Sequence, residues 1–156
     1  MTYSIRPATP RDLPPVTELL TDAHLTLNSV DSQFGPQFAV AVDDDSGAVI
    51  GVAGIELYGD HGERIGLFRS AAVRDAWRGQ RVGAALTEDR LCWAERERLA
   101  SVFLLTETAT EYWPRFGFVR VARDSVPAAM QESHEWRHGC PASAVAMRLD
   151  LPRTGA

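Results

Sequence analysis

The sequence predicts an α/β (α+β) domain, with a mixed central sheet of about seven strands and flanking helices. Residues 38–73 read as an antiparallel three-strand meander whose turns are marked by DDDSG and GDHG. A long helical segment follows at 82–99, and an apolar strand comes next at 101–109. Strand, helix and strand in this order imply a right-handed crossover between two parallel strands.

The elements before the meander are a strand at 4–9 and a helix at 12–25. The helix carries an apolar stripe formed by Leu13, Val16, Leu19, Leu20 and Ala23. We expect Asp12 to be the N-cap, because Pro14 and Pro15 then fall in the first turn, where a missing N–H costs little.

The elements after the meander are less regular. The helix at 82–99 has an imperfect apolar stripe, formed by Val82, Leu86, Trp93 and Ala100, with Asp89 and Arg96 close to it. Beyond the strand at 101–109 we expect a short helix at 110–118 closed by Gly117, a strand at 118–123, a helix at 126–136 and a last strand at 143–151. A single domain is expected over 1–150, with 151–156 as a frayed tail.

Composition excludes several classes of protein. The chain of 156 residues has a net charge of -5 and a pI near 5.3, which argues against a nucleic-acid or anionic-membrane binder. Without a signal sequence or a membrane-length apolar run, we expect a cytoplasmic protein. His134, His138 and Cys140 have a metal-like spacing, but a fourth ligand is missing and Gly139 interrupts them, so we expect no metal site.

The segment WRGQRVGAAL, residues 77–86, joins a short apolar strand to the long helix. Gly79 and Gly83 allow a sharp turn and a close backbone approach. The unpaired amides at a helix start favour an anion such as phosphate, although a simple tight turn is the alternative. Neither GxxxxGK[ST] nor GxGxxG is present, so neither a nucleoside-triphosphate loop nor a dinucleotide fingerprint applies.

The strand SAAV, the loop RGQRVGAAL, the strand VFLLTETA and the closing EYWPRFGF together resemble the GNAT superfamily of acyl-CoA-dependent N-acyltransferases. In the family loop pattern [QR]-x-x-G-x-[GA], Arg78 and Gly83 match, while Arg81 occupies the middle glycine position. LFRSAAV, LLTETATEYWPRFGF and CPASAVAM are similar to the arsenic-resistance-associated N-acetyltransferases. The resemblance covers nearly the whole chain and implies a splay between the fourth and fifth strands.

The resemblance also implies acetyl-CoA as cosubstrate. The pantetheine would pair with the strand residues Ala71, Ala72 and Val73. The pyrophosphate would lie on the loop residues Arg78, Gly79, Gln80, Arg81, Val82, Gly83 and Ala84. Because the binding groups are main-chain amides, Arg81 need not disturb this site. Its side chain could lie over a phosphate, or its φ angle could be strained.

Direct acetyl transfer needs a group that takes the proton of the amine. Glu56, Glu63 and Glu107 are candidates near the splay, and for each an ordinary solvated glutamate is the alternative. We favour Glu107, at the end of the fifth strand. The family often protonates the thiolate with a tyrosine where this chain has Trp113. Tyr112 is therefore the candidate acid, with a packed aromatic as its alternative and with water or helix-start amides as other routes to thiolate release.

Arg69 lies in an apolar stretch, which is unusual for a charged residue. Its fork of donors suits the carboxylate of an amino-acid substrate, and a structural ion pair is the alternative. Ser70 and Thr106 are the other expected substrate contacts.

These features predict acetyl transfer to the primary amine of a small molecule, such as an amino-acid-like arsenical or a glutamate analogue. A non-catalytic acyl-CoA sensor or interaction module is the alternative. No nucleic-acid or membrane partner is expected, and a homodimer is one candidate oligomeric state.

Overall fold

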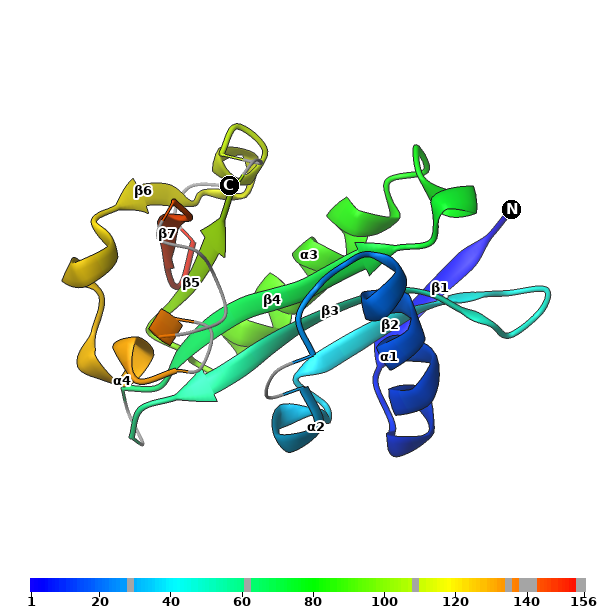
Figure 1. Cartoon of the computed structure of the whole chain (residues 1–156), viewed down its shortest axis with the longest axis horizontal. Coiled ribbons are helices and arrows are strands. Elements are labelled where there is room, and N and C mark those ends of the chain that lie inside the picture. Colours follow the sequence, from blue (N-terminus) through cyan, green and yellow to red (C-terminus); the bar gives the residue numbers. More distant parts are fainter. Residues whose placement is uncertain (28–29, 61–62, 108–109, 134–135, 138–142, 154–156) are drawn as a thin grey trace. The chain divides into compact units, whose positions relative to one another are not determined.

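The computed structural model describes residues 1–27, 30–60, 63–107, 110–133, 136–137 and 143–153. Its seven-stranded mixed sheet has the order β1-β2-β3-β4-β5-β7-β6 (Figure 1). The strands are β1 (Tyr3–Pro7), β2 (Phe38–Asp43), β3 (Val49–Tyr58), β4 (Ile65–Val73), β5 (Ser101–Thr106), β6 (Val119–Val121) and β7 (Val145–Asp150). The α-helices are α1 (Leu13–Asp22), α2 (Val30–Gln33), α3 (Val82–Arg96) and α4 (Ala128–Gln131). The predicted fold class is confirmed.

The chain forms two compact units. Unit 1 comprises Met1–Ile55 and Arg69–Trp93, and unit 2 comprises Glu56–Phe68 and Ala94–Ala156. No helix in the described part of the chain is long and apolar enough to cross a membrane.

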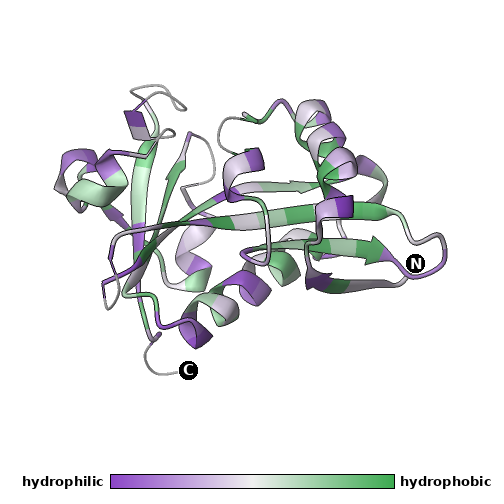
Figure 2. Cartoon of the chain, turned by 90° about the horizontal axis from the view of Figure 1, so that it is seen from below, coloured by the Kyte–Doolittle hydropathy of each residue, from purple (hydrophilic) through white to green (hydrophobic). Residues whose placement is uncertain are grey.

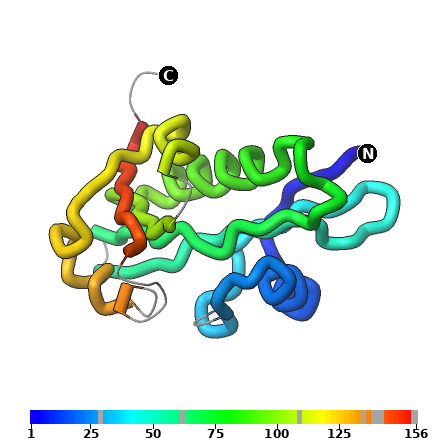
Figure 3. Tube along the Cα trace, turned by 45° about the horizontal axis from the view of Figure 1, so that its top comes forward, coloured from blue at the N-terminus to red at the C-terminus, as the bar shows by residue number. Residues whose placement is uncertain are grey.

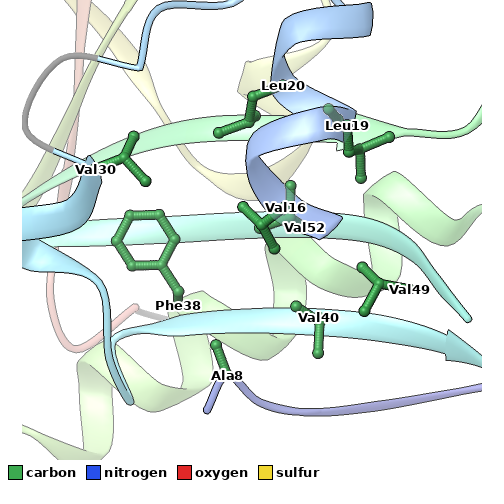
Figure 4. Close-up of a cluster of buried hydrophobic side chains, with 10 residues drawn as sticks. Ala8, Val16, Leu19, Leu20, Val30, Phe38, Val40, Val49 and Val52 are labelled. Atoms are coloured by element: carbon green, nitrogen blue, oxygen red, sulfur yellow. The ribbon is translucent and has the colours of Figure 1, made fainter. Parts of the chain in front are cut away.

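Unit 1 has three layers, with α1 on one face of its strands and α3 on the other (Figure 1). Successive side chains of a strand point to opposite faces of the sheet, so the same strands can pack against α1 on one face and α3 on the other. Val40 and its cross-strand partner Val52 belong to the cluster that α1 covers. Figure 4 shows α1 side chains directed toward these valines. The buried members of this cluster are Ala8, Val16, Leu19, Leu20, Val30, Phe38, Val40, Val49, Val52 and Ala72.

The opposite face of the same strands receives α3. Ala41 pairs with Gly51, and a Cβ atom on Gly51 would lie 3.0 Å from Leu86 Cδ1 and 3.2 Å from Val82 Cγ1. The absence of a side chain at Gly51 therefore lets α3 pack closely against β3. This packing holds the start of α3, and the loop before it, against the sheet of unit 1.

The start of α1 confirms the predicted N-cap position of Asp12 but shows no capping bond from its side chain. The carboxylate accepts hydrogen bonds from Thr9 N at 2.7 Å and from two nitrogens of Arg6 at 2.7 and 3.0 Å. The bonds from Arg6 lower the pKa of Asp12. The preceding residues 10–12 already form a 3-10 turn, so the carboxylate is directed toward Thr9 and Arg6.

Helix α3 begins at Val82 as predicted but ends at Arg96, before a left-handed Arg98 with φ 59°. Its predicted stripe is wrong in the second half, since Ala100 is exposed and Trp93 is only half-buried. The buried residues of the helix are Val82, Leu86, Thr87, Arg90, Leu91 and Ala94. A hydropathy stripe cannot locate this face because one of its residues is a charged arginine.

That arginine, Arg90, is 1% exposed and is held by internal contacts. Its guanidinium pairs with Asp89 at 2.9 Å and donates to the carbonyl of Pro36 at 2.8 Å. The Trp93 ring lies 5.2 Å from the same group. Burial of a charge is tolerated here because its donors meet acceptors.

Unit 2 contains the predicted parallel pair of strands. Ile65–Leu67 of β4 pairs in parallel with Ser101–Phe103 of β5, and no β4–β5 pair is recorded in the described residues beyond Leu67 and Phe103. The ladder thus ends within β4, as the predicted splay requires. On its other side β5 pairs antiparallel with β7, which in turn pairs with β6. Hydrophobic residues predominate on the strands (Figure 2).

The core of unit 2 is built from strand residues and from short helical segments near α4. Its buried members are Ile65, Leu67, Phe103, Val126, Met130, Trp136 and Ala146. The expected helix at 110–118 is a 3-10 turn, Trp113–Phe116, closed by Gly117 with φ 103°. In place of the helix expected at 126–136, the structure has the short α4, and Trp136 lies in a π-helical turn. His134, His138 and Cys140 lie outside the described residues.

Candidate functional site

The loop between β4 and α3 is anchored by Trp77, which is 5% exposed and packs edge-on against Tyr3 with ring centroids 6.1 Å apart. Figure 3 follows the chain through β4, this loop and α3. Gly79 has φ 83°, and a Cβ atom there would meet nothing within 4 Å. The loop therefore turns on a left-handed glycine above open space, which leaves room for a ligand.

The first turn of α3 presents unpaired backbone donors. The first backbone bond into the helix runs from Ala85 N to Arg81 O at 3.0 Å. The preceding amides of Val82, Gly83 and Ala84 have no backbone acceptor in the described structure. A Cβ atom on Gly83 would lie 3.8 Å from Val73 Cγ2, which is an ordinary van der Waals contact. Unpaired amides at the positive end of a helix make an anion site.

Arg81 has φ 62°, in the left-handed region that favours glycine. Of the two expectations for this residue, the strained backbone is observed. Its side chain is exposed, so the strain is not offset by burial of the side chain. The left-handed angle gives a physical reason why a glycine would suit this position of the loop.

A hollow of about 190 Å³ lies beside this loop in unit 1. Its lining residues are Leu19, Asp22, Ala23, Val73, Arg74, Asp75 and Arg78. Arg78 is exposed and pairs with Asp75 at 3.0 Å. Two carboxylates and two guanidinium groups line the hollow, so their charges balance, whereas the amides at the start of α3 present donors alone.

The second half of β4 carries two of the predicted substrate residues. Arg69 is 4% exposed, and its Nε donates to Ser70 Oγ at 2.9 Å while Nη2 donates to Thr26 O at 3.1 Å. Ser70 itself has φ 60° inside a strand. Beyond it Ala71 is exposed and Ala72 is buried. Arg69 and Ser70 thus contact each other at a backbone distortion immediately before the predicted cofactor strand.

The three candidate glutamates differ in burial. Glu63 and Glu107 are exposed, whereas Glu56 is 0% exposed and accepts a hydrogen bond from the Tyr58 hydroxyl at 2.6 Å. The sequence analysis missed Tyr58, although a spacing of two along a strand places it on the same face as Glu56. Thr106, at the end of β5, is half-buried.

Tyr112 lies in an aromatic cluster. Its ring is 4.9 Å from the Trp113 ring and 5.3 Å from the Phe116 ring, with the Arg115 guanidinium 4.5 Å above it. These contacts match the packed-aromatic alternative for Tyr112. Trp113 also packs against Phe68 at 5.3 Å. The indole nitrogen of Trp113 is buried and has no hydrogen-bond acceptor in the described structure.

A comparison with protein families gives the class that this fold and this loop define. Residues 35–120, more than half of the chain, match the acetyltransferase (GNAT) domain. The chain belongs to the GNAT acetyltransferase family, and it is an acyl-CoA-dependent N-acyltransferase. A comparison with curated proteins finds no match.

Solved structures share the fold. N-acetylglutamate synthase from Neisseria gonorrhoeae, complexed with coenzyme A and N-acetyl-glutamate, superposes with a TM-score of 0.78 at 18% identity, covering 98% of this chain. This chain spans only 36% of that synthase. Rv2747 from Mycobacterium tuberculosis, solved with CoA, gives 0.74 at 23% identity and covers 95% and 99% of the two chains. YhbS from Escherichia coli, also solved with CoA, gives 0.70 at 23%, covering 95% and 81%.

The residues of unit 1 fit a CoA diphosphate. The left-handed Gly79 faces open space, and a Cβ atom on Gly83 would make only an ordinary contact with Val73. The amides from Val82 to Ala84 have no backbone acceptor in the described structure. A diphosphate supplies several acceptor oxygens and negative charge, which are what a helix start favours.

Proposed function

We propose that this chain transfers an acetyl group from acetyl-CoA to the primary amine of a small molecule that carries a carboxylate. The observation behind this proposal is the burial of Arg69 beside the left-handed Ser70, directly before the cofactor strand. A buried guanidinium with a planar fork of donors suits a carboxylate. The complex of N-acetylglutamate synthase with N-acetyl-glutamate shows that this fold accepts such a product in another protein.

In this proposal two stretches of unit 1 bind acetyl-CoA. The backbone of Ala71, Ala72 and Val73 pairs with the pantetheine, and the amides that follow Gly79 bind the diphosphate. Acetyl-CoA supplies a thioester carbonyl that an uncharged amine can attack. Arg69 and Ser70 hold the carboxylate end of the substrate.

The amine must lose a proton before or during the attack. We propose Glu107 as the acceptor of that proton, since it follows β5 and is exposed to solvent. Glu56 is the competing candidate, because it is buried and bonded to Tyr58, a hydroxyl that can pass a proton on. A Glu107→Gln and Glu56→Gln pair separates them, since only the variant that lacks the base should lose turnover while it still binds acetyl-CoA.

An amino-acid-like arsenical or a glutamate analogue is the proposed natural substrate, in keeping with the resemblance to arsenic-resistance-associated enzymes. Such molecules carry both the amine and the carboxylate that this site would recognise. Acetylation removes the positive charge of the amine, so an enzyme that recognises the charged amine no longer binds the product.

The test is thiol release from acetyl-CoA across amino acids, arsenical amino acids, polyamines and aminoglycosides. We expect release with α-amino acids or their arsenic or phosphorus analogues and little with amines that lack a carboxylate. Arg69→Lys should reduce amino-acid turnover because the bidentate fork is lost while the charge remains. A polyamine as best substrate, or unchanged turnover in Arg69→Lys, would refute the carboxylate role.

The same assay addresses the sensor alternative. Family membership favours the enzyme, and a non-catalytic module would bind acetyl-CoA without releasing thiol in the presence of any amine. Thermal stabilisation by acetyl-CoA without thiol release would therefore support the sensor.

A further inference from the structure

The hollow beside the β4–α3 loop holds two charged side chains that form no ion pair. Of its four charged residues, Asp75 and Arg78 pair with each other at 3.0 Å, and both are exposed. Asp22 and Arg74 make no recorded ion pair with any residue that the structure describes. The hollow therefore offers one carboxylate and one guanidinium to a ligand.

Asp22 carries its charge at an unfavourable place. It is the last residue of α1, and the last turn of this helix contains no basic residue. The carboxyl end of a helix is negative, so a carboxylate there is repelled and a cation is attracted. Asp22 and the end of α1 together favour a cationic group such as an ammonium.

Arg74 is held at two points and keeps its terminal nitrogens for a ligand. Its backbone N–H donates to Ile50 O at 2.9 Å, and its Nε donates to Val49 O at 2.9 Å. These bonds tie the residue to β3 and orient its guanidinium. Within the described ranges, Nη1 and Nη2 make no recorded hydrogen bond. A planar pair of donors fits a carboxylate.

The other residues that line the hollow are apolar. They are Leu19, which is 3% exposed, and the half-buried Ala23 and Val73. The volume of about 190 Å³ is below the roughly 300–1,000 Å³ typical of sites for larger ligands. The hollow therefore suits a small molecule that carries an ammonium, a carboxylate and a short apolar chain.

We propose that this hollow binds a small aliphatic α-amino acid in its zwitterionic form. The ammonium lies against Asp22 and the end of α1, and the carboxylate lies on the terminal nitrogens of Arg74. The aliphatic side chain contacts Leu19. This site uses neither Arg69 nor Ser70, so it goes beyond the proposed function.

The first measurement follows the side-chain Nε–H resonance of Arg74 in 15N-labelled protein, with L-valine as the probe. The resonance is identified by its absence in Arg74→Lys. L-valine should shift it and saturate the shift. Isobutylamine, which lacks the carboxylate, and isovalerate, which lacks the ammonium, should need about tenfold more ligand or fail to shift it. An unmoved signal with L-valine, or equal titrations with all three, would overturn the inference.

The second measurement compares Asp22→Asn with the matched control Glu18→Gln, an exposed acid of the same helix that does not line the hollow. Asp22→Asn should weaken L-valine binding about tenfold or more, because a charge-assisted hydrogen bond is lost. Glu18→Gln should leave binding unchanged. Neither variant should lower Tm, since Asp22→Asn removes a repelled charge. Equal affinities in the two variants would contradict the ammonium contact.

Arg69→Lys separates this site from the proposed function. The L-valine shift of the Arg74 resonance should persist in this variant while amino-acid turnover falls. If the wild-type protein releases no thiol with any amine and the Arg74 resonance still shifts, the acetyl-transfer proposal fails and the hollow stands as a binding site. Loss of the shift in folded Arg69→Lys would overturn the separate site.

Discussion

The two halves of β4 differ in pairing, burial and backbone geometry. The first half, Ile65–Leu67, pairs in parallel with β5 and is buried throughout. The second half begins with the buried Arg69, contains the left-handed Ser70 and exposes Ala71. One half contributes to the core of unit 2, and the other carries the buried Arg69 beside the left-handed Ser70. The two halves differ in this way because the pairing with β5 stops partway along the strand.

The largest effect is expected in the first half. Leu67→Ala removes a fully buried side chain from the core of unit 2 and should lower the free energy of unfolding by about 2–5 kcal/mol. Urea denaturation measures this loss. The stabilisation by acetyl-CoA should persist, since the groups that we propose to bind it lie in the second half and in the loop. A loss of acetyl-CoA binding in the folded variant would show that the two halves are not separable.

The loop beyond the second half gives the next prediction. Gly83→Glu places a negative charge at the diphosphate position and should abolish the acetyl-CoA stabilisation, which reaches about 2.7 kcal/mol at a concentration of 100 Kd. Gly83→Ala is the matched control, because its Cβ meets only an ordinary contact with Val73. Thermal unfolding with and without acetyl-CoA distinguishes them. A full shift in Gly83→Glu would disprove the loop assignment.

Ser70 tests the distortion within the second half. Ser70→Ala loses the acceptor for Arg69 Nε and keeps the left-handed strain, so we expect a loss of about 1.5–3 kcal/mol. Ser70→Gly loses the same acceptor but relieves the strain, and its loss should be smaller by about 1 kcal/mol. Equal unfolding free energies for the two variants would mean that the left-handed angle carries no strain.

Arg81 gives the smallest expected effect. Its φ of 62° is strained in the same way as that of Ser70, but its side chain is exposed. Arg81→Gly should therefore raise the free energy of unfolding by no more than about 1 kcal/mol, after the entropy of the new glycine is counted. Activity should stay within about tenfold, or roughly 1.4 kcal/mol, because main-chain amides hold the diphosphate. A far larger loss would assign the phosphate contact to the side chain.

Local patterns in the chain were enough to predict the main elements of the fold. The meander, the helix start at Val82 and the parallel strand at 101–106 follow from periodicity and turn residues, which act over a few positions. The prediction of an anion site in the loop rests on the same kind of local pattern, because the glycines and the helix start are adjacent in the chain. Arg81 stands where the family pattern has a glycine, and a strained φ was one of the two alternatives considered for it.

Features that depend on residues far away along the chain could not be predicted from local patterns. The buried face of α3 includes Arg90, whose burial depends on the carbonyl of Pro36, far away along the chain. The N-cap position of Asp12 was predicted correctly, but its carboxylate accepts hydrogen bonds from Arg6 and Thr9 and not from α1. The unsatisfied indole of Trp113 depends on which rings surround it. Periodicity reports which residues prefer burial, but the partners of a buried polar group are known only once the packed structure brings them together.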